Sequence, residues 1–274
     1  MAYIVSGEKL QNLCDIYLGY DDDFNYNPLI QIQTNKHVYL NNLNTDFNNP
    51  LYIFCYTNRI NELSSKIHYF QNDFILITHN SDDGIIPNNN VLTILNCDKL
   101  IKWYGHNVYF EHSKLFFLPI GLANSIWPHG NLSLFNNPNF IKTIDIKTKK
   151  VYFNFKIDTN RHKRPICYDS LKNKLEWLEK VEPLNNIIRL KDFEFCICPE
   201  GNGADTHRLW ECFYLKVVPI VIKSPFTNIL INKGLPILVL ENWNDLDIQK
   251  LNYADFDFNS PNLVKLLDFN NYFY

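Results

Sequence analysis

The chain has 274 residues, of which 46% are hydrophobic and 20% are charged. This composition supports a substantial core in one large domain or two of ordinary size, and it excludes an intrinsically disordered protein. The formal net charge of −3 gives no support for sequence-independent nucleic-acid binding, which needs a concentrated basic surface. No run approaches the roughly 20 apolar residues of a membrane span, and the N-terminus lacks a signal-peptide pattern. We therefore expect a soluble, cytoplasmic protein with no membrane span.

Residues 1–50 are polar and Asn-rich, with short candidate strands at 29–33 and 37–40. Asp21–Asp23 match an Asp-x-Asp pattern with which some enzymes hold a metal–nucleotide complex. Metal sites favour carboxylates at the end of a buried strand, and three acidic residues in a polar stretch are more often a solvated loop. We therefore expect no metal site here.

The first strong strand candidates are Leu51–Tyr56 and Asp73–Thr78, with a helix between them. Polar residues follow the second strand directly, from His79 to Gly84. Open α/β sheets bind ligands at the carboxyl ends of their strands. Asp82 or Asp83 could act there as a general base. The alternative is a polar turn that simply ends the strand.

Two more strands are expected at Leu100–Tyr104 and Leu115–Leu118. The first is followed by His106, and the second by an aromatic, amide-rich loop that contains Trp127 and His129. Such a loop suits stacking against a sugar ring and hydrogen bonds to its hydroxyls. A crossover between domains with a buried Trp is the alternative.

A lysine-rich stretch, Pro138–Lys149, is a plausible junction, and the chain restarts with a strand at Val151–Phe155. A helix is expected from about residue 158 towards 179. Arg161, Lys163 and Arg164 lie at its start, in a strand-to-helix turn. These side chains are either a solvated helix end or contacts for a phosphate group.

The most informative stretch begins with an apolar strand, Phe195–Cys198, and a Gly-Asn-Gly turn at 201–203. A helix that is capped by Asp205 or Thr206 and runs to about Lys216 follows, and then a strand at Val217–Val221. Glycine lets the backbone approach a ligand, and the free N–H groups of a helix start favour an anion. Arg208 could add a phosphate contact, and Glu211 could accept hydrogen bonds from sugar hydroxyls.

The seven cysteines are odd in number and mostly lie in apolar runs. Reduced, buried thiols are the simplest explanation. Cys196 and Cys198 have one residue between them instead of two, which is a poor zinc or redox pattern. We expect a structural role for them.

Each half of the chain alternates buried strands with helices and has polar strand ends. This pattern predicts an α/β fold of two Rossmann-like, doubly wound domains that face each other across a cleft, with boundaries at 1–145 and 146–274.

The stretch FCICPEGNGADTHRLWECFYLKVVPIV (195–221) resembles the donor-binding segment of the exostosin-like glycosyltransferases. It is most similar to small viral and microbial members, in which a Ser-Pro turn follows, here Ser224-Pro225. The segment LPILVLENW (235–243) is similar to the end of that region. Weaker similarity extends upstream over most of the chain.

This resemblance implies a GT-B fold and an inverting transfer from a UDP-sugar co-substrate to a glycan hydroxyl. It implies the donor in the C-terminal domain, the acceptor mainly in the N-terminal domain, and no obligatory metal or other cofactor. The implied base is Asp82 or Asp83. The donor-binding residues would be Arg161, Arg164, Gly201, Asn202, Gly203, Asp205, His207, Arg208 and Glu211, and the acceptor-binding residues would be His79, His106, Trp127 and His129.

Two departures from the family pattern are visible. Lys216 stands where many relatives have a small residue, and the membrane anchor of the animal Golgi enzymes is missing, which favours cytoplasmic glycan assembly. Two alternatives stay open. One is a glycan- or nucleotide-sugar-binding protein without catalysis, and the other is a metal-dependent transferase that uses Asp21–Asp23.

Overall fold

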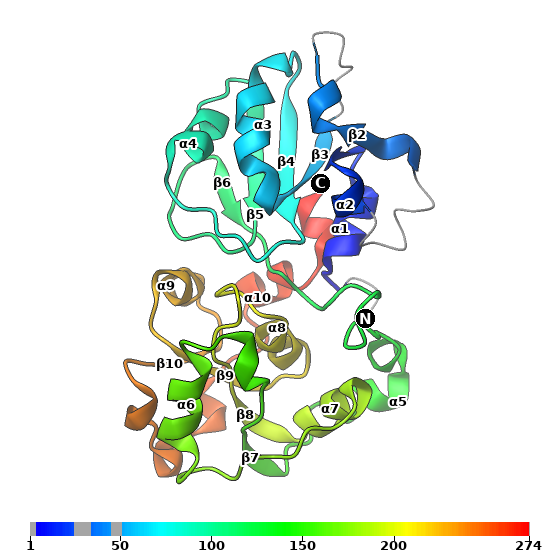
Figure 1. The fold of residues 1–274 in the computed structure, drawn as a ribbon. Coiled ribbons are helices and arrows are strands. Elements are labelled where there is room, and N and C mark those ends of the chain that lie inside the picture. Colours follow the sequence, from blue (N-terminus) through cyan, green and yellow to red (C-terminus); the bar gives the residue numbers. More distant parts are fainter. Residues whose placement is uncertain (1–3, 25–33, 45–50, 274) are drawn as a thin grey trace. The chain divides into compact units, whose positions relative to one another are not determined.

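The computed structural model describes residues 4–24, 34–44 and 51–273. These residues form two compact units (Figure 1). The N-terminal unit consists of residues 4–130 and 268–273, and the C-terminal unit consists of residues 131–267. Each unit is built around one parallel β-sheet, so the chain has the mixed α/β architecture expected of Rossmann-like folds.

The sheet of the N-terminal unit has the strand order β2-β1-β3-β4-β5-β6, and all its pairs are parallel. This is a doubly wound order, with its topological switch point between β1 and β3. The strands are β1 (Ile16–Gly19), β2 (His37–Tyr39), β3 (Tyr52–Tyr56), β4 (Phe74–His79), β5 (Leu100–Gly105) and β6 (Leu115–Phe117). The α-helices are α1 (Gly7–Leu13), α2 (Asp21–Phe24), α3 (Ile60–Lys66) and α4 (Asn89–Leu95). The 3-10 helices are η1 (Thr34–Lys36), η2 (Leu40–Asn42), η3 (Thr57–Arg59), η4 (Ile67–Tyr69) and η10 (Phe269–Tyr272).

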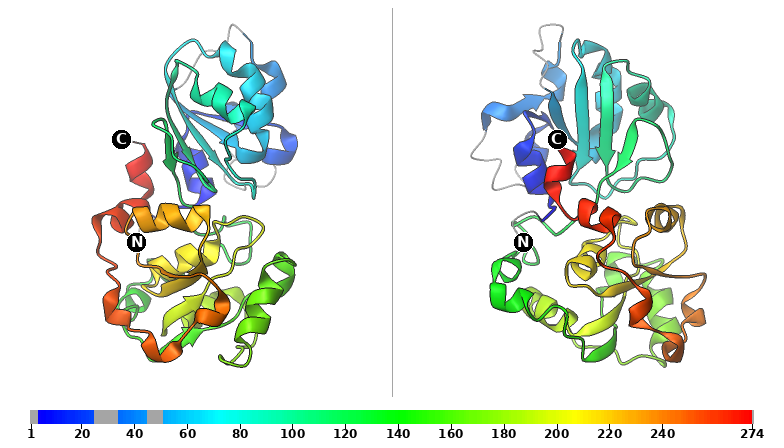
Figure 2. Two further views of the ribbon diagram at one scale, coloured as in Figure 1. Left: turned by 90° about the vertical axis from the view of Figure 1, so that its left-hand side faces the viewer. Right: turned by 180° about the vertical axis from the view of Figure 1, so that it is seen from behind.

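Helices α3 and α4 cover one face of this sheet, and residues 268–273 lie against the opposite face (Figure 2). Tyr272 contacts Tyr104 of β5 edge to face at 5.4 Å, and Tyr52 of β3 donates a 2.6 Å hydrogen bond to the carbonyl of Phe273. The C-terminal residues therefore complete the core of the N-terminal unit.

The sheet of the C-terminal unit has the order β10-β9-β8-β7, again with parallel pairs. The strands are β7 (Lys149–Tyr152), β8 (Phe193–Ile197), β9 (Val218–Ile222) and β10 (Leu238–Leu240). The α-helices are α5 (Pro138–Ile141), α6 (Arg164–Leu171), α7 (Pro183–Leu190), α8 (His207–Tyr214), α9 (Pro225–Asn232) and α10 (Pro261–Leu266). The 3-10 helices are η5 (Leu134–Asn136), η6 (Ile157–Thr159), η7 (Trp243–Asp245), η8 (Ile248–Lys250) and η9 (Tyr253–Asp255).

One face of this second sheet packs under α6 and the segment that follows β10. Phe195, Ile197, Val218 and Ile220 alternate inward along the two central strands and are fully buried. They contact Cys167 and Leu171 of α6 and Trp243 and Leu246 of the following segment. This core fixes the distance between α6 and the end of β10, and these two elements frame the cavity described below.

The expected boundary at residue 145 is corrected by the structure. The C-terminal unit begins at residue 131, because the rings of Phe135 and Tyr214 meet at 6.0 Å and Phe135 and Phe140 are buried in the same cluster. The lysine-rich stretch is therefore part of the C-terminal unit and not a junction.

Most expected strands and helices form, with shifted ends. The helix expected over residues 158–179 is only α6, because Pro165 occupies its first turn and it ends at Leu171. The helix expected to reach Lys216 ends at Tyr214, and Lys216 itself has a left-handed φ of 52°. The candidate strand at 37–40 is confirmed as β2, and the one at 29–33 lies outside the described residues. None of the helices in the described ranges has the length and hydropathy needed to cross a membrane.

Candidate functional site

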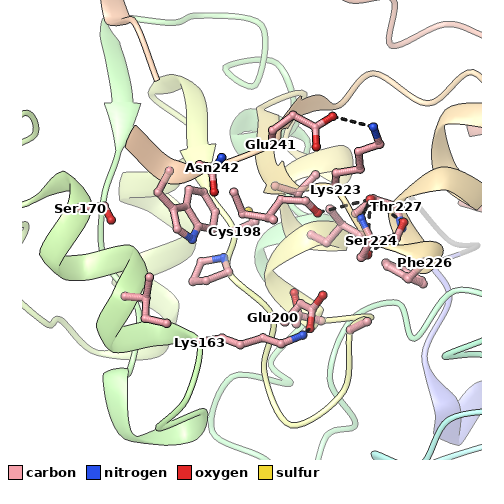
Figure 3. A pocket seen from close by; sticks show the side chains of 18 of the residues that line it. Lys163, Ser170, Cys198, Glu200, Lys223, Ser224, Phe226, Thr227, Glu241 and Asn242 are labelled. Carbon is pink, nitrogen blue, oxygen red and sulfur yellow. Dashed lines mark hydrogen bonds and ion pairs between the residues drawn. The ribbon is translucent and has the colours of Figure 1, made fainter. Parts of the chain in front are cut away.

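A cavity of about 340 Å³ lies in the C-terminal unit at the carboxyl ends of its central strands. Its walls are the residues that follow β8 (198–200), the end of β9 and the residues after it (221–224), and the residues that follow β10 (241–244), together with one face of α6 and the start of α8 (Figure 3). Ligands of open parallel sheets bind at this edge. The volume falls in the range of about 300–1,000 Å³ that is typical of small-molecule sites.

The cavity combines an apolar interior with charged walls. Trp243, Phe226 and Leu209 are buried and contribute apolar surface. Lys223 forms a 2.6 Å ion pair with Glu241, and Lys163 forms a close ion pair with Glu200. Figure 3 shows these two pairs on different sides of the cavity. The lysine side chains are 52% and 59% exposed, so both are accessible to a ligand.

The glycine turn is held against the start of α6. Arg164 donates from Nε to the carbonyl of Glu200 (2.9 Å) and from Nη1 to the carbonyl of Lys156 (2.7 Å). Asn160 donates to the carbonyl of Gly201 (2.7 Å). Burial, and then the charge of Arg208, lower the pKa of Arg164 to about 10, so it is a cation at neutral pH. Arg164 therefore positions the turn, and this differs from the direct phosphate contact predicted for it.

Arg208 and Glu211 bind each other. Arg208 donates from Nε to Glu211 Oε2 (2.9 Å) and from Nη1 to the carbonyl of Asn154 (3.0 Å), and its guanidinium lies 5.3 Å from the ring centre of Tyr152. Burial opposes the charge of Arg208, but the Glu211 carboxylate and the neighbouring thiols outweigh it and raise its pKa well above the ordinary value. The cavity wall includes neither residue.

The other predicted donor-binding residues are also next to the cavity instead of in its wall. Asp205 is buried and accepts a 2.6 Å hydrogen bond from the indole of Trp210. Asn202 and Arg161 are exposed, and His207 is half-buried at the start of α8. Gly201 donates to the carbonyl of Gly203 (3.0 Å), which closes the turn.

The backbone φ angles of the turn do not require glycine at positions 201 and 203. Gly201 and Gly203 are both outside the left-handed region of φ. A Cβ atom at Gly201 would meet Arg164 Nη2 at 3.4 Å and Thr206 Cγ2 at 3.5 Å, which is close to an ordinary contact. A ligand that approaches the backbone of the turn would explain glycine at this position.

Sequence reasoning missed most of the cavity wall. Lys223 follows β9, and Glu241 and Trp243 follow β10. Ligands of open α/β sheets bind at the carboxyl ends of the strands, and this holds for β9 and β10 as it does for β4. Polar residues directly after these two strands could therefore have been predicted from the sequence. The sequence predicted a basic group at the start of α6, and the structure shows that Lys163 lines the cavity whereas Arg161 and Arg164 do not.

In the N-terminal unit, His79 and His106 are buried at the carboxyl edge of the sheet. His79 bonds with the side chain of Asn80 (3.0 Å) and the carbonyl of Pro119 (3.2 Å), and His106 bonds with the carbonyl of Ser81 (2.5 Å). Burial lowers the pKa of His106 despite these backbone bonds. Both imidazoles support the edge of the sheet, and this differs from the contact with an acceptor predicted for them.

A polar network surrounds His79 that the sequence did not predict. Asn80, in a left-handed conformation with φ of 59°, donates to Gln11 Oε1 (3.1 Å) and accepts from Asn124 Nδ2 (3.1 Å). Gln11 in turn donates to the hydroxyl of Tyr56 (2.8 Å). A Cβ atom at Gly7 would come within 1.8 Å of Asn80 Oδ1, so this network requires glycine there.

Asp82 and Asp83 are exposed in the turn after β4. The backbone N–H of Asp83 donates to Ser81 Oγ (3.2 Å), and Asn107 donates to the carbonyl of Asp82 (3.3 Å). The polar-turn alternative therefore describes this backbone correctly. The exposed carboxylates can still reach a ligand.

Trp127 and His129 are an exposed aromatic pair. Both are exposed, Trp127 by 50%, and their rings stack with centres 6.5 Å apart and planes 22° apart. The alternative of a crossover between domains is correct for the position of the loop, which ends at the boundary between the units at residues 130 and 131, but its Trp is not buried. An exposed, stacked aromatic pair suits contact with the apolar face of a sugar ring.

Asp21–Asp23 form part of helix α2 instead of the expected solvated loop. Asp23 is buried, pairs with Arg59 (2.9 Å) and accepts from the backbone N–H of Tyr20 (2.9 Å). Asp21 accepts a 2.6 Å bond from the hydroxyl of Tyr39. These contacts give two of the three carboxylates a structural role.

In comparisons with known proteins, no family model matches the chain, and no curated protein matches it.

Proposed function

We propose that the protein is a glycosyltransferase that binds a UDP-sugar in the cavity of the C-terminal unit and transfers the sugar to a hydroxyl group of a glycan. The observation that carries the proposal is the position of this cavity at the carboxyl ends of β8, β9 and β10, next to the glycine turn. The resemblance of residues 195–221 to the donor-binding segment of exostosin-like enzymes supports the same assignment.

The cavity wall matches the three parts of a nucleotide. Trp243 and Phe226 offer apolar surface for a base, and the carboxylates of Glu200 and Glu241 can accept hydrogen bonds from ribose hydroxyls. Lys163 and Lys223 can bind a diphosphate if they leave their carboxylate partners. These charges would also stabilise the departing diphosphate of an inverting transfer without an obligatory metal ion.

The proposal includes a GT-B arrangement, with the donor on the C-terminal unit and the acceptor on the N-terminal unit. Asp82 or Asp83 would accept the proton of the attacking hydroxyl. Trp127 and His129 would hold the acceptor sugar by stacking.

A calorimetric titration with UDP tests the donor assignment. Ser170, on α6, lines the cavity, and Ser170→Phe should fill it and abolish UDP binding. Asp169 on the same helix is 63% exposed and is absent from the cavity wall, so Asp169→Phe is the matched control and should bind UDP as the wild type does. UDP binding that survives Ser170→Phe would remove the cavity from the proposal.

Catalysis is tested by UDP release from a panel of UDP-sugars, with and without EDTA. We expect release in EDTA, and its loss in Asp82→Asn or Asp83→Asn with UDP binding unchanged. The second candidate, a nucleotide-sugar-binding protein without catalysis, is favoured by the exposure of both carboxylates in a turn, because a general base must be held within hydrogen-bond reach of the attacking hydroxyl. Tight UDP binding with no release of UDP under any condition would favour this candidate.

A further inference from the structure

Three cysteine side chains converge between β8 and α8 in the C-terminal unit. Cys196 lies in β8 and Cys198 is the first residue after it, two positions on, so both point to the same face of the sheet. Cys212 lies on α8, which packs on that face. The three Sγ atoms are all within 4.8 Å of one another, and those of Cys198 and Cys212 are 3.7 Å apart.

The three thiols are shielded from bulk solvent and lie next to a cation. Cys196 and Cys212 are fully buried, and Cys198 is 5% exposed. Arg208, which pairs with Glu211, precedes Cys212 by four residues, so the same helix face presents a thiol and a guanidinium.

The cluster also has a path to solvent. Cys198 lines the cavity at the carboxyl edge of the sheet, where Figure 3 shows it. An ion can therefore reach the thiols from the cavity without opening the core of the sheet.

We propose that Cys196, Cys198 and Cys212 form a binding site for a single Cu(I) ion, held by three thiolates. Soft sulfur ligands select soft ions, of which Cu(I) is one. Structural zinc sites almost always have four protein ligands. Among the residues that the structure describes, no His, Asp or Glu joins this group as a fourth ligand. Three sulfur atoms at these separations suit a three-coordinate ion.

Binding forms three Cu–S bonds and breaks the S–H bonds of the thiols, which release up to three protons to the solvent. No oxidant or reductant is consumed when the ion is supplied as Cu(I). No thiol takes part in the proposed glycosyl transfer, but Cys198 also lines the proposed donor cavity, so Cu(I) binding is measured without UDP.

The test is an anaerobic titration of the reduced full-length protein with Cu(I), in competition with a chromophoric Cu(I) chelator. We expect one ion per chain. Loss of a group that only orients a metal ligand weakens metal binding by about 10–100-fold. We expect Cys196→Ser, Cys198→Ser and Cys212→Ser each to weaken Cu(I) binding by more than this, because each removes a ligand. The matched control is Cys14→Ser, because Cys14 is also buried but lies in the N-terminal unit, where its thiol donates to the carbonyl of Leu10 at 3.3 Å. It should bind Cu(I) as tightly as the wild type.

X-ray absorption of the Cu(I)-loaded wild type measures the number of sulfur ligands directly and does not depend on the folding of any variant. Three sulfur neighbours around copper are expected. Two sulfur neighbours, or binding of equal strength in the wild type and in Cys198→Ser, would overturn the proposal. So would a reduced wild type that binds no Cu(I) in competition with the chelator.

Discussion

Arg208 was predicted from the sequence to bind phosphate, but its contacts in the fold indicate a structural role. Its side chain pairs with Glu211, whose side chain is only 8% exposed, and it also bonds to a backbone carbonyl. Removing one partner of a buried ion pair leaves the other charge uncompensated. We therefore expect Arg208→Ala to lower the free energy of unfolding by about 3 kcal/mol, at the lower end of the range for such changes.

Urea denaturation of this variant, with and without UDP, measures the effect. The double variant Arg208→Met with Glu211→Leu removes both charges and should recover most of the lost stability, because replacing a whole buried pair by apolar groups is often nearly neutral. If Arg208→Ala had wild-type stability and lost only UDP binding, the direct phosphate contact predicted from the sequence would be correct instead.

Lys163 and Lys172 allow a matched comparison of two cations at the two ends of α6. Lys163 lines the cavity and pairs with Glu200, whereas Lys172 pairs with Asp169 away from the cavity. Charge-assisted bonds contribute about 1.5–3 kcal/mol, and exposure places Lys163 at the low end of this range. We expect Lys163→Ala to weaken UDP binding about tenfold by calorimetry, and Lys172→Ala to leave it unchanged. If both variants weakened UDP binding equally, the cause would be the lower positive charge of the whole unit and not a contact of Lys163 with UDP.

At the scale of elements, Lys147 joins the ends of two helices. Its Nζ donates to the carbonyls of Lys191 (2.8 Å) and Leu215 (2.7 Å), which follow α7 and α8. Burial lowers the pKa of Lys147 from 10.5 to about 8. Cationic side chains at helix C-termini satisfy carbonyls that have no partner within the helix.

This lowered pKa predicts a dependence of stability on pH. Between about pH 8 and 10.5 the folded chain has lost the Lys147 proton and the unfolded chain still holds it, so unfolding takes up a proton. Raising the pH through this window should therefore increase the stability of the wild type relative to Lys147→Met. Urea unfolding of both proteins at several pH values measures the difference. A constant difference across the window would show that Lys147 keeps its ordinary pKa when folded.

At the scale of the whole molecule, the chain returns to its first unit at the end. Tyr272 and Phe273 are buried there, with 5% and 8% exposure. Burying an aromatic side chain contributes about 1.5–3 kcal/mol. We expect the double variant Tyr272→Ala with Phe273→Ala to destabilise the N-terminal unit by about 3–6 kcal/mol.

Hydrogen exchange resolved by strand tests this expectation. Protection should fall in β3, β4 and β5 and persist in β8 and β9. Val264→Ala is the control, since Val264 is 56% exposed on α10 in the C-terminal unit. Equal loss of protection in both sheets would show that residues 268–273 do not belong energetically to the first unit alone.

The local pattern of the sequence determined the class of fold. Continuous apolar runs such as Phe74–Thr78 and Val218–Ile222 identify buried parallel strands, because both faces of such strands are covered. Strand ends, helix starts and the glycine turn follow from residues within a few positions, so they too were visible in the sequence. The ends of the helices were predicted less well from the sequence, because tertiary packing decides where a weak helix ends.

The tertiary structure alone decided which side chains meet. Arg208 and Glu211 are residue types that bind phosphates and sugars. In the fold, Arg208 instead contacts the carbonyl of Asn154 and the ring of Tyr152, more than 50 positions earlier in the chain. Lys223, Glu241 and Trp243 join one cavity because three parallel strands end at the same edge. Cys196 and Cys198 had a poor metal-binding spacing until α8 brought Cys212 to them. Contacts between distant segments depend on how the strands are ordered, and that order is not encoded in any single stretch.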